Sequence, residues 1–304
     1  MPAIPFYTTD VFTQKQFGGN QLAVFPDARA IPEKLMLPIA REFNFSETTF
    51  VLPPKDSKHT RSVRIFTPGG ELKFAGHPTI GTAFVLASIG DIKLSGDETP
   101  IVLEELVGPV PVTIKTDKGK PGFAQLSVAK LPEFGPPAPK AADLARMVGL
   151  ETSDVLTGEF APEAASCGTP FLFVPLKNRK ALARASARAD DFAKVLKGYW
   201  TEHVFYFCDE PELPGSHYRA RMFAPGIGVG EDPATGSAAV AFGGYLAKRD
   251  KRAEGTLRWV IEQGFEMGRP SMLEVEVDKR AGKVTAARVG GYSVLVSKGE
   301  FSIP

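Results

Sequence analysis

The sequence predicts an α/β protein made of two similar halves, and three observations carry this prediction. Short strand-like runs alternate with a few helical patterns along the 304 residues. A pair of motifs from the first half recurs in the second half. Residues 130–140 are rich in proline and fit neither a continuous helix nor a central strand, so they are the best candidate for a linker. We place the N-terminal half at residues 1–130 and the C-terminal half at residues 131–304, whose last strand can cross back to the first half.

The first half contains apolar runs rich in β-branched and aromatic residues, each bounded by Gly, Pro, Asp or Ser. These runs predict strands at residues 5–12, 22–25, 48–52, 62–67, 101–106, 110–115 and 124–128. Helical spacing of apolar residues predicts helices at residues 33–43, interrupted by Pro38, and at residues 78–89.

The second half follows the same alternation of strands and helices. Strands are predicted at residues 171–176, 203–208, 217–223, 256–262, 272–277, 284–289 and 293–297. Helices are predicted at residues 141–148, 189–196 and 233–248.

The internal repeat has two parts in each half. The segment Arg64–Gly69 recurs as Arg221–Gly226, and His77–Ala83 recurs after it as Asp232–Ala238. Both copies then run into an apolar helical pattern. Each half therefore reads as a strand, a Gly-rich loop and a helix, and two such units facing one another would form a cleft.

In both loops a polar residue, His77 or Asp232, precedes a proline at the predicted start of a helix. Gly81 and Gly236 then remove side chains where something must approach the backbone closely. A helix N-terminus offers unpaired N–H groups to a carboxylate, but contributes at most about 2 kcal/mol. A small acid would therefore need both helix ends. The alternative is a pair of tight turns without a ligand.

Glu47 is the third ionisable candidate, and it lies between a helical pattern and a β-rich run. From the residues alone it fits either an ordinary exposed turn acid or a desolvated base. The glycines of residues 226–230 lack the third glycine of a dinucleotide motif and the lysine of a P-loop, so a nucleotide site is rejected.

Composition excludes several classes of function. The formal net charge is +1 and the aromatic residues do not alternate with Lys and Arg, so we expect no nucleic-acid partner. No apolar run approaches the roughly 18 residues of a membrane helix. Two cysteines suit a reducing cytoplasm, and four well-separated histidines predict no metal site.

Six ordered segments are similar to those of the phenazine-biosynthesis PhzF-like family, within the diaminopimelate epimerase superfold. Together they run through nearly the whole chain. Gln21 departs from the family pattern, which commonly has proline after the Asn. The segments are Phe17–Phe25, Phe45–Phe50, Phe74–Thr79, Gly230–Ser237, Gln263–Ser271 and Val289–Tyr292.

The resemblance implies two pseudo-symmetric halves, each a curved, mainly antiparallel sheet around a central helix. It implies an isomerase that works without metal or cofactor and moves a proton at carbon of a small cyclic or amino-acid-like carboxylate, as in isomerisation of a dihydro-hydroxyanthranilate. Glu47 is the expected acid/base, with His77 and Asp232 facing it. A homodimer is also expected. The expected substrate-binding residues are Asn20, Ser46, Gly76, Gly81, Gly236 and Ser237.

Three other functions remain open at this stage. A racemase or epimerase of the same superfold would use two thiols, but the matching positions are Ala75 and Thr235. A non-catalytic protein could bind a small acid at the two helix ends. A hydrolase or lyase could use the same base.

Overall fold

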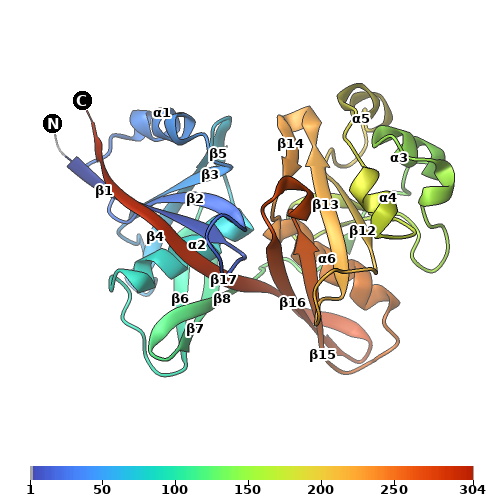
Figure 1. The fold of residues 1–304 in the computed structure, drawn as a ribbon. Helices are drawn as coiled ribbons and strands as arrows, with labels where there is room; N and C mark the ends of the chain where they lie inside the picture. The colour runs from blue at the N-terminus through green and yellow to red at the C-terminus, as the bar shows by residue number, and fades with distance from the viewer. Residues whose placement is uncertain (1–2, 304) are drawn as a thin grey trace. The chain divides into compact units, whose positions relative to one another are not determined.

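The computed structural model describes residues 3–303, which fall into two units (Figure 1). The first unit comprises Met1–Ser127 with Gly290–Pro304, and the second comprises Val128–Val289. The last strand, β17 (Lys283–Ser302), therefore contributes its beginning to the second unit and its end to the first.

The strands of the first unit pair in a closed circuit, β1–β2–β3–β4–β6–β7–β8–β17 and back to β1. The pairs β2–β3 and β4–β6 are parallel, and β5 adds to β4 as an antiparallel strand. Such closure leaves none of the strands of the circuit as a sheet edge. The bounds are β1 (Ala3–Val11), β2 (Asn20–Phe25), β3 (Glu47–Leu52), β4 (Arg61–Thr67), β5 (Gly70–Leu72), β6 (Glu98–Glu105), β7 (Gly108–Asp117) and β8 (Lys120–Ser127).

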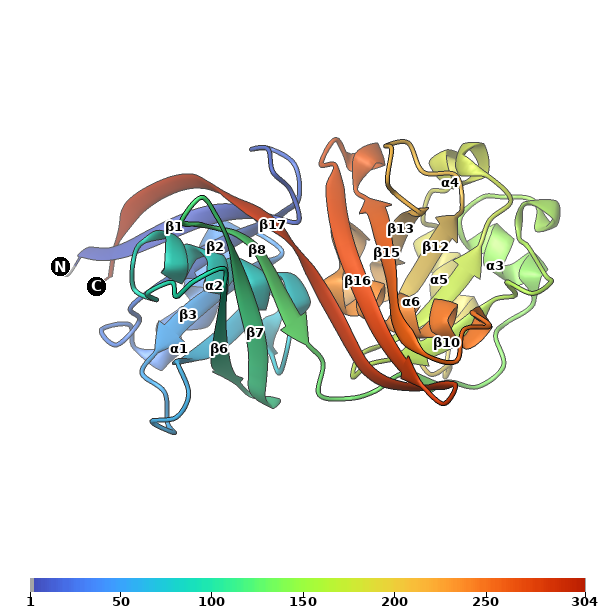
Figure 2. The same ribbon diagram turned by 90° about the horizontal axis from the view of Figure 1, so that it is seen from below.

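Helix α2 (Gly76–Ser88) lies inside this circuit, where it packs against β1, β2, β3, β7 and β8 (Figure 2). Every residue from Gly76 to Ala87 is buried, because the helix is apolar on all sides. The predicted start at Pro78 is wrong. The helix begins at Gly76 with Ala75 as N-cap, and Pro78 sits within the first turn, where a missing N–H costs no helix hydrogen bond.

Helix α1 (Glu33–Phe43) connects β2 to β3 and has the predicted bounds. Pro38 does not end it. Its apolar side chains Met36 and Ile39 pack in a cluster with Phe25 and Phe50. Asn44 then adopts a left-handed conformation with φ 51°, which ends the helix before Glu47 opens β3.

The second unit repeats the order of the first. Its pairs β11–β12 and β13–β15 are parallel, and β14 adds to β13 as β5 adds to β4. The pairs β9–β10, β10–β11, β12–β13 and β15–β16 are antiparallel. The bounds are β9 (Glu133–Phe134), β10 (Glu163–Ser166), β11 (Pro170–Pro175), β12 (Val204–Cys208), β13 (Tyr218–Ala224), β14 (Val229–Asp232), β15 (Gly255–Gln263) and β16 (Ser271–Arg280).

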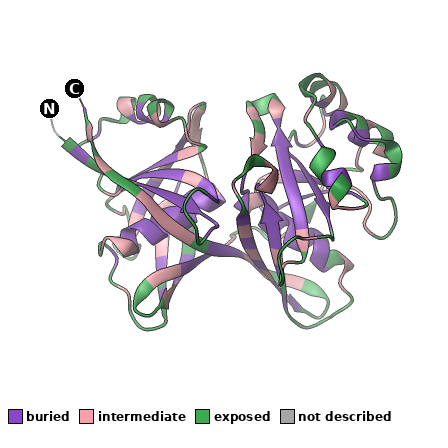
Figure 3. Cartoon of the chain, viewed as in Figure 1, coloured by how far each residue is buried: buried purple, intermediate pink, exposed green. Residues whose placement is uncertain are grey.

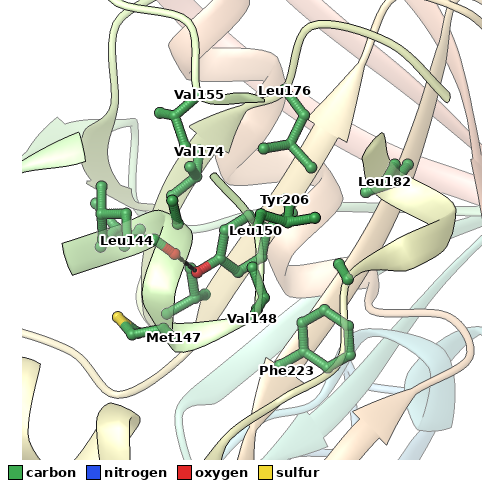
Figure 4. Close-up of a cluster of buried hydrophobic side chains, with 14 of the residues drawn as sticks. Leu144, Met147, Val148, Leu150, Val155, Val174, Leu176, Leu182, Tyr206 and Phe223 are labelled. Carbon is green, nitrogen blue, oxygen red and sulfur yellow. Dashed lines mark hydrogen bonds between the residues drawn. The ribbon is translucent and has the colours of Figure 1, made fainter. Parts of the chain in front are cut away.

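Helix α6 (Gly236–Arg249) is the buried central helix of the second unit and contacts β10, β11, β15 and β16. Three short helices, α3 (Ala141–Met147), α4 (Arg179–Arg184) and α5 (Ala189–Val195), turn exposed faces to solvent (Figure 3). Their apolar side chains cover β11, β12 and β13, and the Tyr206 hydroxyl donates to the Leu144 carbonyl at 2.9 Å (Figure 4). The matching helix-and-sheet arrangement in both units confirms the predicted fold class.

The proline-rich segment 130–140, predicted as a linker, is packed along its length. Gly135 N–H donates to the Ala164 carbonyl, and the Tyr199 hydroxyl donates to the Pro136 carbonyl at 3.1 Å. A Cβ on Gly244 would lie 2.4 Å from the Pro132 side chain. The segment is thus packed onto the second unit, and the division between units falls just before it, after Ser127.

The repeat aligns differently in the structure than in the sequence. The first part of the repeat aligns as predicted, since its two copies lie on the equivalent strands β4 and β13. In the second part the helices begin at Gly76 and Gly236, so His77 corresponds to Ser237 rather than to Asp232. Asp232 is therefore not an N-cap as predicted. It ends β14, the chain stays non-helical through Thr235, and Thr235 is the N-cap.

Within residues 3–303, no helix has the length and apolar character required to cross a membrane.

Candidate active site

Glu47 and His77 meet in the first unit. The parallel register of β2 and β3 puts Leu22 opposite Glu47, and α2 delivers His77 from its first turn. Glu47 Oε2 lies 3.1 Å from His77 Nε2, and the two side chains are only 14% and 6% exposed. Glu47 is thus a shielded acid beside a histidine, and the interpretation as an ordinary exposed turn acid is wrong.

His77 is a neutral ring in this environment. Burial lowers the pKa of His77 to about 3, because the charged ring would lose its hydration, while a hydrogen bond with the Gln21 main chain opposes this effect. The 3.1 Å contact between Glu47 Oε2 and His77 Nε2 brings the carboxyl group and the ring within reach of the same proton. Since Gln21 acts through its main chain, its side chain does not enter this contact.

The position of His77 depends on how α2 is held against the sheet. Thr82 of α2 and Thr49 of β3 hydrogen-bond through their hydroxyls at 2.9 Å. A Cβ on Gly81 would lie 2.6 Å from side-chain carbons of both Leu22 and Val11. The close approach predicted at Gly81 is therefore made by the sheet, and this glycine has a packing role.

The Phe17–Asn20 motif forms a tight turn that sets the start of β2. Asp10 is buried, and its carboxylate accepts from the Phe17 N–H at 2.7 Å. Gly19 has a φ of 63°, and a Cβ there would lie 2.2 Å from the Val11 carbonyl oxygen. The buried Asn20 follows as the first residue of β2. Among the other expected substrate-binding residues, Ser46 is exposed just before β3 and Gly76 is the buried first residue of α2.

Asp232 lies in the second unit in a braced loop that leads into α6. The Thr235 hydroxyl donates to Asp232 Oδ2 at 2.5 Å. The Gln263 amide donates to the Asp232 carbonyl at 2.7 Å and to Thr235 Oγ1 at 2.9 Å, and its oxygen accepts from Thr235 N–H at 3.1 Å. Gly236 and the partly exposed Ser237 open the helix directly after this loop.

Gln263 is a functional candidate that reasoning from the sequence missed. It is fully buried, and both ends of its amide are bonded to the loop. Its only signal was its place in the family-like segment Gln263–Ser271. The end of its strand is fixed by Arg219, which pairs with Glu262 at 3.1 Å and stacks 3.7 Å from the Phe265 ring.

The described residues favour carboxyl and imidazole chemistry over thiol chemistry. Ala75 and Thr235 are the N-cap residues of α2 and α6, so neither helix start presents a cysteine. Cys167 and Cys208 are both buried, and burial raises their pKa values to about 12 and about 11. Among residues 3–303, no cluster of three or more His, Cys, Asp or Glu side chains is arranged to hold a metal ion.

Comparison with known proteins places the chain in a family. The family model described as phenazine biosynthesis-like protein matches residues 9–299. The chain belongs to this family. A trans-2,3-dihydro-3-hydroxyanthranilate isomerase from Pseudomonas aeruginosa is 33% identical over 97% of this chain and 98% of the relative. An uncharacterized isomerase from Mesorhizobium japonicum is 38% identical over 97% of both chains.

Solved structures agree with this assignment. A phenazine biosynthesis protein of the PhzF family from Bacillus anthracis is 28% identical, with a TM-score of 0.90 and complete coverage of both chains. A hydroxyproline epimerase from Agrobacterium vitis, 15% identical with a TM-score of 0.64 over 98% of this chain and 92% of the epimerase, shows a shared fold alone. For this phenazine biosynthesis-like protein, the prediction of an isomerase is confirmed. That Asp232 acts together with Glu47 and His77 stays a prediction.

Proposed function

We propose that this protein isomerises a small cyclic carboxylic acid of the dihydro-hydroxyanthranilate type by moving a proton between carbon atoms, without a metal or cofactor. The observation that carries the proposal is the shielded pair of Glu47 and neutral His77, 3.1 Å apart. The family relative that acts on trans-2,3-dihydro-3-hydroxyanthranilate supports the substrate class.

Glu47 is the proposed acid/base. Its carboxylate would remove a proton from a substrate carbon, the electron pair would spread over the conjugated double bonds, and the same carboxyl group would return the proton to another carbon. The resulting enol would then become the ketone. A neutral His77 suits this role, because a cationic partner at 3.1 Å would weaken Glu47 as a base.

The second loop is proposed to serve the same substrate. The first turns of α2 and α6 each present main-chain N–H groups that suit a carboxylate, at Gly76 in one and at Gly236 and Ser237 in the other. Asn20 and Ser46 are proposed as further substrate contacts. Asp232, which already accepts from Thr235, is proposed to receive a donor group of the substrate such as an amine.

The test is proton exchange at carbon. Wild type and Glu47→Gln are incubated in D₂O with trans-2,3-dihydro-3-hydroxyanthranilate and related cyclic acids, and deuterium at carbon is followed by NMR. Glu47→Gln keeps the shape of the side chain but cannot cycle a proton, so we expect turnover to fall at least about a hundredfold. Glu98→Gln is the matched control, since Glu98 is an exposed acid whose side chain is 60% accessible.

Near-normal exchange by Glu47→Gln would overturn the role of Glu47. Binding of the acids by wild type without any exchange would instead favour the non-catalytic binding protein. Exchange that inverts a stereocentre and leaves the double bonds in place would favour the epimerase.

A further inference from the structure

Glu105 is a buried acid that the proposed reaction does not use. It ends β6, is 7% exposed, and its Oε1 lies 2.5 Å from Thr79 Oγ1. Its Oε2 is buried and has no hydrogen-bond partner among residues 3–303. An ionised carboxylate is costly in such a place, and burial raises the pKa of Glu105 to about 8. At neutral pH Glu105 is therefore the neutral acid.

Counting hydrogens shows which way these bonds run. Thr79 Oγ1 lies 2.7 Å from the Ala75 carbonyl as well as 2.5 Å from Glu105 Oε1, but a hydroxyl has one hydrogen. The Ala75 carbonyl can only accept, and an ionised Glu105 carboxylate can also only accept, so Thr79 cannot donate to both at once. Both contacts are hydrogen bonds at the same time only when Glu105 carries a proton and donates it to Thr79, which then donates to Ala75.

The hydrogen bonds from Glu105 to Thr79 and from Thr79 to Ala75 lead to the start of helix α2, which carries His77. Ala75 is the N-cap of α2, Thr79 closes its first turn, and His77 lies between them. Ionisation of Glu105 would make its oxygen compete with the Ala75 carbonyl for the single Thr79 hydrogen. That competition would loosen the turn that sets His77 Nε2 beside Glu47.

We infer that Glu105 is a positioning residue of the reaction: as a neutral acid it donates to Thr79 and so fixes the first turn of α2, which holds His77 against Glu47. This inference rests on the proposed role of Glu47 and His77.

The charged groups on the neighbouring strands are already paired with one another. Arg64 of β4 lies beside the cavity that Glu105 lines, where it binds Glu71 of β5 at 2.7 Å and Glu33 of α1 at 2.9 Å. On α2 the nearest titratable group along the chain is the neutral His77. Arg64 is thus already engaged by two other carboxylates.

Glu104 is the other acid at the end of β6, and both of its carboxylate oxygens accept hydrogen bonds. It accepts from the main-chain N–H groups of Lys55 and Asp56 at 2.8 Å each and contacts His59 Nδ1 at 2.8 Å. These bonds lower the pKa of Glu104 to about 2. Glu104 is therefore the ionised acid at the end of β6, in contrast to the buried Glu105.

The experiment compares the pH profiles of wild type and Glu105→Gln. The glutamine amide can donate to Thr79 at any pH, whereas the acid loses its hydrogen above about pH 8. We expect wild-type kcat at pH 9 to be about tenfold below its value at pH 7, since about a tenth of Glu105 stays protonated one unit above its pKa. Glu105→Gln should retain activity at pH 7 and lose this high-pH decline.

The second readout needs no substrate. An acid with a raised pKa stabilises the fold fully below its ordinary pKa near 4.5, and that contribution is lost as pH rises to about 8. The Tm of wild type relative to Glu105→Gln should therefore fall between about pH 5 and pH 8 and then level off. Thr79→Val should lower kcat at pH 7 by about tenfold or more, while Thr79→Ser should retain it.

The outcomes separate the two proposals. Matching Tm profiles for wild type and Glu105→Gln would overturn the inference, with or without a known substrate. Matching kcat profiles, or full activity of Thr79→Val, would also overturn it. A Tm difference of the expected sign in a protein with no exchange at carbon would support neutral Glu105 and count against the proposed function alone.

Discussion

Gly81 shows how a single missing side chain sets the position of helix α2 against the sheet. It lies in α2 where the helix meets Leu22 of β2 and Val11 of β1. In a free helix, Gly→Ala would stabilise by about 1 kcal/mol, but here the new methyl would sit 2.6 Å from both neighbours. Overpacking typically costs about 1–3 kcal/mol, so the packing effect outweighs helix propensity.

We therefore expect Gly81→Ala to lower the thermal stability of the first unit by several degrees and to reduce turnover, because α2 carries His77. Differential scanning calorimetry and the exchange assay measure both effects. Gly70→Ala, at a glycine with nothing within 4 Å of the added carbon, is the control. A Gly81→Ala protein more stable than wild type would contradict this expectation, because it would show that Leu22 and Val11 can move to make room for the methyl group at little cost.

At this scale the sequence predicts residue types better than contacts. Glu47 and His77 could be chosen as a pair only through the resemblance to the family, since the residues alone also fit ordinary polar positions, and the structure does bring them together. Gly81 could be recognised as a point of close approach, but a glycine does not identify what approaches it. Glu105 gave no signal, since only the fold reveals that its side chain is buried beside Thr79.

The loop from Asp232 to Thr235 gets its shape from one glutamine on a neighbouring strand. Gln263→Leu would remove the acceptor for Thr235 N–H and the donors for the Asp232 carbonyl and Thr235 Oγ1. Each unsatisfied buried group costs about 1–3 kcal/mol. We expect a clear loss of stability in the second unit and at least a tenfold loss of turnover, because misplacing a positioned group is costly.

Thermal unfolding and the ratio of kcat to KM provide the check on Gln263→Leu. Gln263→Glu should be milder, since its carboxylate still accepts from Thr235 N–H. Gln16→Leu, at an exposed glutamine of the first unit, should leave both quantities unchanged. If Gln263→Leu and Gln16→Leu had the same unfolding temperature and the same ratio of kcat to KM, Gln263 would not hold the loop from Asp232 to Thr235 in place.

Element boundaries were predictable where local signals dominate and not where tertiary contacts do. Helix α1 has the predicted bounds because its amphipathic pattern and the following Asn are local. The starts of α2 and α6 were wrong because His-Pro and Asp-Pro resemble caps, while the real N-caps are Ala75 and Thr235. The two-residue strand β9 has too short a pattern to be detected from the sequence.

The first unit is completed by β17, which joins it after passing through the second unit. The register of β1 with β17 runs from Ala3 opposite Ser302 to Val11 opposite Ser293, with a shift after Thr8. Deleting residues 297–304 would strip β1 residues 3–8 of these partners on one side. We expect hydrogen exchange in β1 to speed up at least about tenfold, equivalent to about 1.4 kcal/mol, with the second unit unaffected.

Mass spectrometry of exchanged peptides tests this prediction, and strands β11, β12 and β13 provide an internal control. Equal acceleration in both units would show that the end of β17 stabilises the molecule as a whole.

The two halves themselves were predictable from the repeat. The packing of segment 130–140 was not, because prolines indicate only where regular structure stops.

The same strand has a consequence for how the protein is made. A ribosome releases β1 first, yet the circuit around α2 closes only when residues 290–302 have been synthesised. Nascent domains usually fold in the order in which they emerge. Here the first unit is completed after the second, so its sheet edges stay open to a chaperone, or to another nascent chain, until residues 290–302 have emerged.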